Sequence, residues 1–138
     1  MAAFFKFNQF VEDLGLGVHN LDTGVIRVYL SNATPSASLD LIKTDLAEIS
    51  TGNGYTGAID VSGVWTETSG TAQLAATDQT ITASGGTIGP FRYAVLYNDT
   101  PTSPADPLIG CWDYGSAVTL NDGESFTVDF GATVFTLA

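Results

Sequence analysis

Apolar residues at the start of the chain recur at a spacing that is typical of an α-helix. They follow one another at alternating three- and four-residue steps, which places them on one face. These positions are Phe4, Phe7, Val11, Leu14 and Val18. We predict a helix over about residues 3–17, ended by the glycines at its C-terminal side. Its apolar face either packs on the chain's own sheet or docks on a neighbouring subunit, and in the second case Phe4, Phe7 and Val11 are the contact residues.

Two further elements follow before the middle of the chain. The run VIRVYL at residues 25–30 is rich in β-branched residues and predicts a strand. A second helical stripe then places Leu39, Ile42, Leu46 and Ile49 on one face. Ser38 stands where a helix N-cap would be. We therefore predict a short helix over about residues 39–49.

The pattern changes from about residue 51 onward. Glycine, threonine and serine are frequent, and short β-branched or aromatic runs are separated by turn residues such as Asn121-Asp122-Gly123. The runs are IDVSGVW, TAQLAA, TITA, FRYAVLY, LIGCWDYG, SAVTL, ESFTVDF and TVFTL. Many short strands at close spacing predict an antiparallel β-sandwich, jelly-roll-like or immunoglobulin-like. The length fits one mainly β domain over residues 1–138.

The run FRYAVLY is apolar on both faces, which predicts a central strand. Phe91, Tyr93, Val95 and Tyr97 alternate with Arg92 on the opposite face. A guanidinium that is taken out of water needs a carboxylate partner. Asp113 in the following strand is the expected partner, so we predict a structural ion pair between Arg92 and Asp113.

The segment NDTPTSPADP after this strand contains three prolines. Proline restricts a loop and denies it ladder hydrogen bonds, so we expect the segment to project from the sheet with a defined shape. It serves either as a solvated connector or as a subunit or capsid contact, with Pro101 and Pro104 as the contact residues.

Composition excludes several classes of partner. The 138 residues include 15 acidic and 4 basic ones, for a net charge of −11, and 44% are hydrophobic. Nucleic-acid surfaces need clustered lysine and arginine, and an anionic membrane repels such a chain, so we expect neither partner. No run is long enough to span a bilayer, and the first residues make a poor secretory signal. A single cysteine excludes an internal disulfide.

Residues for catalysis or metal binding are few, and we expect no enzyme, no cofactor and no metal. His19 is the only histidine, and we expect it to be uncharged at the surface or in a capping role. Cys111 lies between Gly110 and Trp112 in an apolar run, which favours an inert core thiol. The acidic residues of the last third follow a solvated-surface pattern without calcium-loop spacing. Trp65 and Trp112 leave a glycan-binding module as an alternative.

Three phrases in the chain are distinctive together: GNGYT at 52–56, GGTIGPFRYAVLYNDT at 85–100 and PLIGCWDYGSAVTLNDGESFTVDF at 107–130. With the opening FFKFNQFVEDLGLGVHNL, they resemble small structural proteins of tailed-bacteriophage virions, of the kind that decorate or cement the capsid. The resemblance implies a non-enzymatic protein, made in the bacterial cytoplasm, that binds the major capsid protein on the outside of the shell, typically as a homotrimer. A tail, connector or fibre component is the alternative within the virion.

Overall fold

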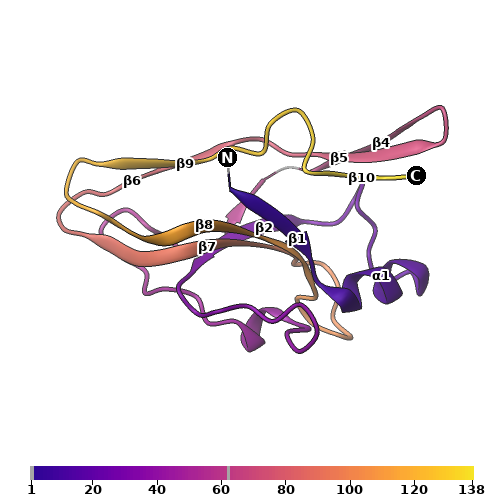
Figure 1. The fold of residues 1–138 in the computed structure, drawn as a ribbon, viewed down its shortest axis with the longest axis horizontal. Coiled ribbons are helices and arrows are strands. Elements are labelled where there is room, and N and C mark those ends of the chain that lie inside the picture. The colour runs from indigo at the N-terminus through magenta and orange to yellow at the C-terminus, as the bar shows by residue number, and fades with distance from the viewer. Residues whose placement is uncertain (1, 62) are drawn as a thin grey trace.

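The computed structural model describes residues 2–61 and 63–138. Antiparallel strands are the main regular structure in this part of the chain, accompanied by one α-helix and one 3₁₀ turn (Figure 1). The mainly β, antiparallel class predicted from the sequence is therefore confirmed. Among the described residues, no helix is both long and apolar enough to cross a membrane.

The largest sheet has the strand order β1-β8-β7-β2-β3. Its strands are β1 (Ala3–Lys6), β8 (Leu108–Leu120), β7 (Ile88–Asn98), β2 (Ile26–Ser31) and β3 (Ile59–Asp60). β7 lies at the centre of this sheet, as its two apolar faces predict, because β8 and β2 pair with it on either side.

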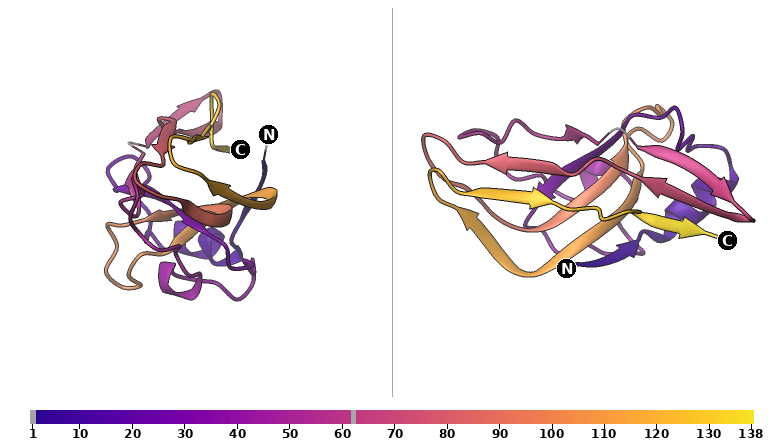
Figure 2. Two further views of the ribbon diagram at one scale, coloured as in Figure 1. Left: turned by 90° about the vertical axis from the view of Figure 1, so that its left-hand side faces the viewer. Right: turned by 90° about the horizontal axis from the view of Figure 1, so that it is seen from above.

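Two smaller sheets form a second layer over one face of this sheet (Figures 1 and 2). One has the order β10-β5-β4 and the other pairs β6 with β9. Their strands are β4 (Val64–Thr68), β5 (Thr71–Ala75), β6 (Gln79–Thr82), β9 (Ser125–Val128) and β10 (Phe135–Leu137). Some of the turns predicted from the sequence separate consecutive strands. Asn121-Asp122-Gly123, for example, lies between β8 and β9.

The central strand contributes to two separate hydrophobic clusters. Between the layers lie Phe91, Ala94 and Leu96, whereas Tyr93 and Val95 belong to the cluster on the outer face of the large sheet. The sequence predicts Phe91 on the same face as Tyr93, and this is wrong. The pairing of β7 with β8 shifts register between Phe91 and Tyr93, and such an irregularity changes which face a side chain meets.

The predicted helix over residues 3–17 is wrong in its first part. Residues Ala3–Lys6 form β1, which pairs with β8, and only Asn8–Gly15 form a helix, α1. Gly110 of β8 explains the strand, because a side chain there would overlap the ring of Phe4. The spacing of the apolar residues fits a helix, but the backbone of β1 forms its hydrogen bonds with the distant strand β8 instead. Within α1 the buried positions are Phe10 and Asp13, and Val11 is 54% exposed.

The predicted helix over residues 39–49 is also wrong, since only Lys43–Asp45 form a 3₁₀ turn, η1. The backbone of this segment bonds elsewhere. The carboxylate of Asp45 accepts hydrogen bonds from the N–H groups of Leu41 and Ile42. The carbonyl of Leu41 accepts one from Leu108. Leu46 is buried as the stripe predicts, but Leu39 is 76% exposed.

Candidate functional site: an aromatic groove and two exposed surfaces

A groove runs beside β1, between the two layers of the fold. Its larger part has a volume of about 850 Å³ and is lined by β1, by β8 and by the segment that joins β9 to β10. A smaller part of about 360 Å³ lies between β1 and β10 and shares Phe4 with the larger one. Besides Phe4, the larger part is lined by Trp112 and Phe130, and the smaller part is lined by Phe10 and Phe135. We call this feature the aromatic groove.

Ring contacts hold the floor of the aromatic groove together. The ring centroid of Phe4 lies 4.9 Å from that of Trp112 and 6.2 Å from that of Phe135. Trp112 also packs against Phe130 at 5.3 Å, edge to face. Such pairs stabilise beyond the area they bury. The sequence analysis missed this groove, although the aromatic residues at both ends of the chain were a signal for it.

Trp112 is only 7% exposed, because Phe4 and Phe130 pack against it. A sugar-binding platform needs an open aromatic face, and this ring offers little of one. Trp65 is half-buried and its ring packs against Phe135. The placement of both tryptophans therefore gives the glycan-binding alternative no specific support.

The predicted ion pair of Arg92 and Asp113 is present at the rim of the aromatic groove. Arg92 Nε lies 2.8 Å from Asp113 Oδ1, and Arg92 Nη2 lies 3.1 Å from Oδ2. This two-point hydrogen bond lowers the pKa of Asp113 and raises that of Arg92. Both side chains are part-exposed rather than buried, so the pair fixes geometry at the surface.

The predicted contact residues lie in very different places. Phe4 lines the aromatic groove, but Phe7 is completely buried and cannot contact a partner, because it belongs to the cluster on the outer face of the large sheet. Val11 is exposed on α1. In the proline segment, Pro104 is exposed and Pro101 is half-buried, so the segment does project from the sheet.

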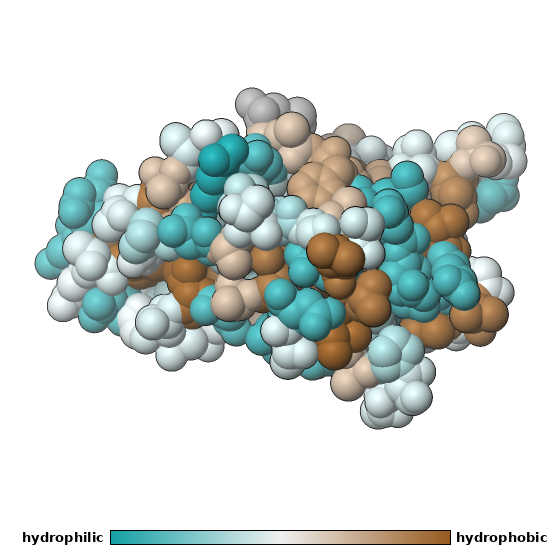
Figure 3. Space-filling view, turned by 60° about the horizontal axis from the view of Figure 1, so that its bottom comes forward, coloured by the Kyte–Doolittle hydropathy of each residue, from teal (hydrophilic) through white to brown (hydrophobic). Residues whose placement is uncertain are grey.

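A second surface is the apolar face, which we define by the exposed residues Val11, Leu16, Leu39 and Leu41. Figure 3 shows apolar side chains on the side of the molecule that lies lowest in Figure 1, in groups that hydrophilic side chains separate. The exposed fractions of the four defining residues run from 42% for Leu41 to 76% for Leu39. The Asn8 N–H donates to the carbonyl of Ala37, which holds the start of α1 against this segment.

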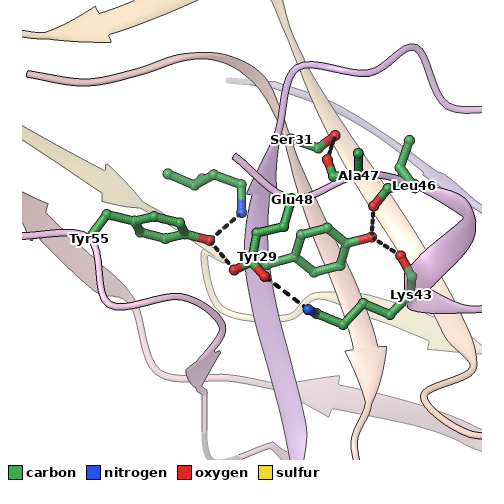
Figure 4. A network of polar contacts seen from close by, with 8 residues as sticks. Tyr29, Ser31, Lys43, Leu46, Ala47, Glu48 and Tyr55 are labelled. Atoms are coloured by element: carbon green, nitrogen blue, oxygen red, sulfur yellow. Dashed lines mark hydrogen bonds and ion pairs between the residues drawn. The ribbon is translucent and has the colours of Figure 1, made fainter. Parts of the chain in front are cut away.

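A polar network beneath the apolar face ties the segment between β2 and β3 to the large sheet (Figure 4). The hydroxyl of Tyr55 accepts from the Leu30 N–H at 3.0 Å and donates to Glu48 Oε1 at 2.7 Å. Glu48 also forms an ion pair with Lys43, and the hydroxyl of Tyr29 donates to the Leu46 carbonyl. Burial raises the pKa of both tyrosines, so they stay protonated and act as donors.

His19 and Cys111 are both buried, and neither of them lines the aromatic groove. The expectation of a surface or capping histidine is wrong, because His19 packs edge to face on Phe10 and its Nδ1 contacts Asn98 Nδ2 at 3.3 Å. Burial lowers the pKa of His19 to about 4, against the opposing effect of Asp13. Burial raises the pKa of Cys111 to about 12, which keeps the thiol protonated.

The burial of His19 predicts a pH-dependent loss of stability. Unfolded His19 binds a proton near pH 6.5 and folded His19 only near pH 4. Protonation therefore favours unfolding between these values, and the free energy of unfolding falls by about 3 kcal/mol as the pH drops through that window. In urea titrations, His19→Gln should lose less stability than the wild type between pH 6.5 and pH 4. Equal losses in the two proteins would contradict the burial of a neutral imidazole.

Metal-ligating side chains do not gather anywhere in residues 2–61 and 63–138, where no group of three or more His, Cys, Asp or Glu could hold a metal ion. The acidic turn at residues 121–124 is closed by its own bonds instead. The Asn121 N–H donates to Glu124 Oε1, and Asp122 Oδ1 accepts from the Gly85 N–H. These carboxylates therefore serve as turn-forming acceptors.

Comparison with known proteins identifies no family or function for this chain. The chain matches no protein-family model, no curated protein and no solved structure.

Proposed function

We propose that this chain is a non-enzymatic structural protein of a tailed-bacteriophage virion. In this proposal it is a decoration protein that binds the major capsid protein on the outside of the shell, as a homotrimer, and stabilises the junctions between capsomers. The observation that carries the proposal is the apolar face on a strongly acidic chain. Attachment there uses buried apolar area rather than charge.

The distribution of charge supports an outward-facing coat. Three of the four basic residues are held in ion pairs, namely Arg27 with Asp99, Lys43 with Glu48 and Arg92 with Asp113. Acidic residues outnumber basic ones by 11, so the chain keeps a large excess of negative charge after these pairs are formed. Net negative charge keeps unassembled copies soluble.

The proposal also draws on the resemblance to virion structural proteins, and the phrases that carry this resemblance contain central strands of the fold. The phrase at residues 85–100 contains β7, and the phrase at 107–130 contains β8 and β9. The GNGYT phrase places Tyr55 in the polar network under the apolar face. β2 lies beside β7 although a long connection separates them in the chain. Such returns are typical of Greek-key arrangements, which favours a jelly-roll-like or immunoglobulin-like sandwich as the finer class.

Many copies on one shell make a modest contact sufficient. Each copy adds a small binding free energy, and the sum stabilises the particle against heat and internal pressure. A rigid β domain suits this role because it loses little conformational entropy when it binds.

The proposal is tested by adding the purified protein to undecorated capsids of the phage that encodes it. We expect wild-type protein to sediment with the capsids and to raise the temperature at which they break. Leu39→Asp places a charge on the apolar face and should weaken binding by about tenfold or more. Val64→Asp is the matched control, because Val64 is also exposed, at 52%, but lies on β4.

Failure of the wild-type protein to bind or protect the capsids would overturn the decoration role. Binding to isolated tails instead would favour the tail or connector alternative. Equal binding by the Leu39→Asp and Val64→Asp variants would move the contact away from the apolar face.

A further inference from the structure

β1 has one edge that pairs with nothing in the described part of the chain, since it ends the order β1-β8-β7-β2-β3. Its register with β8 identifies the backbone groups on that edge. The Phe7 N–H donates to the Ile109 carbonyl, and bonded residues alternate along an antiparallel ladder. Ala3 and Phe5 therefore bond β8, whereas the N–H and carbonyl groups of Phe4 and Lys6 point away from it. These two residues present a strand edge to a partner.

The free edge of β1 borders the aromatic groove. Phe4, Phe5 and Lys6 line its smaller part together with Phe135 and Thr136 of β10, and β10 is itself the end strand of its sheet. The sandwich is thus open on the side where the two terminal strands lie (Figure 2). An extended segment laid along β1 would use the backbone edge and cover the apolar floor at the same time. This is the geometry of recognition by strand addition.

The charges that line the aromatic groove indicate which kind of extended segment would bind there. The larger part of the groove is lined by Asp113 and Asp129, and Arg92 neutralises only Asp113. Burial raises the pKa of Tyr114 to about 12, and the negative charge of the nearby Asp129 carboxylate adds to this effect. A basic residue at this end of the segment would complement Asp129. A second copy of the chain is a poor source of such a segment, because three of its four basic residues are already held in ion pairs.

We propose that the aromatic groove binds an extended segment of another protein, which adds as a strand to the free edge of β1. The segment alternates apolar side chains toward the groove with polar ones, and it carries lysine or arginine at the Asp129 end. This surface is distinct from the apolar face, and the proposal holds whether or not the chain decorates a capsid.

Lys6→Pro tests the proposal directly. Proline removes an N–H that bonds nothing in β1-β8, and an edge strand tolerates proline where its N–H faces outward. The preceding residue, Phe5, is already in a strand, as proline requires. Lys6→Ala is the matched control, because it loses the same side chain and keeps the N–H. Thermal unfolding of both variants verifies that they remain folded.

The probe is a short capped peptide that alternates valine and threonine and ends in two lysines, with a twin that ends in two glutamates. In NMR titrations up to about 1 mM peptide, we expect the lysine peptide to shift the amide signals of Phe4, Lys6 and Thr136. Lys6→Pro should weaken its binding by about tenfold, and Lys6→Ala by less than about threefold.

Four results would overturn the proposal. The lysine peptide would cause no shift at these amides, or it would bind Lys6→Pro as tightly as Lys6→Ala. Equal binding of the glutamate twin would refute the charge selection. Self-association that Lys6→Pro abolishes, without peptide binding, would assign the edge to a second copy and reject the heterologous segment.

Discussion

Replacing Phe7 with alanine is expected to lower the free energy of unfolding by about 3–5 kcal/mol. Phe7 is completely buried between β1 and α1, where it packs with the cluster on the outer face of the large sheet. Truncation of its ring removes buried apolar area and leaves a cavity. Urea-induced unfolding, followed by tryptophan fluorescence, measures the loss.

Val11→Ala is the control for Phe7→Ala. A continuous helix over residues 3–17 would place both side chains on one buried face. In the structure Val11 is 54% exposed, so its truncation should cost less than about 0.5 kcal/mol. Similar losses in the two variants would contradict the division of this segment into β1 and α1.

Gly54→Ala is the second substitution with a large expected effect, about 3 kcal/mol or more. Gly54 has a φ of +104°, a region that residues with a Cβ rarely adopt. An added Cβ would also overlap the carbonyl oxygen of Thr82, which is backbone and cannot turn aside. The turn that positions Tyr55 over β2 would then have to move.

Gly85→Ala separates the cost of the positive φ from the cost of the overlap between an added Cβ and neighbouring atoms. Gly85 also has a positive φ, +82°, but an added Cβ there would meet no atom within 4 Å. We expect its cost to be about 1 kcal/mol, from backbone strain alone. Thermal unfolding of the two variants compares them directly. A Gly54→Ala protein as stable as Gly85→Ala would show that the turn does not approach β6 in this way.

Most strands from residue 51 onward were predictable because their signals are local. The runs LIGCWDYG and SAVTL nevertheless form the single strand β8, and IDVSGVW contributes to both β3 and β4. Turn residues such as Asn121-Asp122-Gly123 end one strand and begin the next, and β-branched runs fill the space between them. The pairing of Arg92 with Asp113 was predictable for a related reason. Both residues lie in consecutive long strands, and a guanidinium between apolar residues has few possible partners.

In the first fifty residues, the strand predicted at 25–30 is present as β2, and α1 lies within the predicted helix. The rest was not predictable, because distant residues decide its structure. β1 exists because Gly110, more than a hundred positions later, leaves room for the Phe4 ring. The segment at 39–49 bonds to Asp106 and Leu108 as well as to itself. The burial of His19 likewise depends on Asn98.

The aromatic groove could not be derived from periodicity either. Its walls come from β1, β8 and β10, and only the pairing of β1 with β8 and of β10 with β5 brings them together. The sequence indicated which side chains were aromatic, and Trp65 and Trp112 left a sugar-binding platform only as an alternative to core or interface positions. The structure buries Trp112 and leaves the backbone edge of β1 as the accessible feature.

The central claim is that the chain coats the outside of a phage shell, and a cryo-electron map of the parent particle tests it most directly. The proposal predicts trimeric density on the outer surface of the shell, at junctions between capsomers, with Leu39 and Leu41 of the apolar face toward the major capsid protein. Density along the tail, or a shell whose outer surface carries no density for this chain, would contradict it.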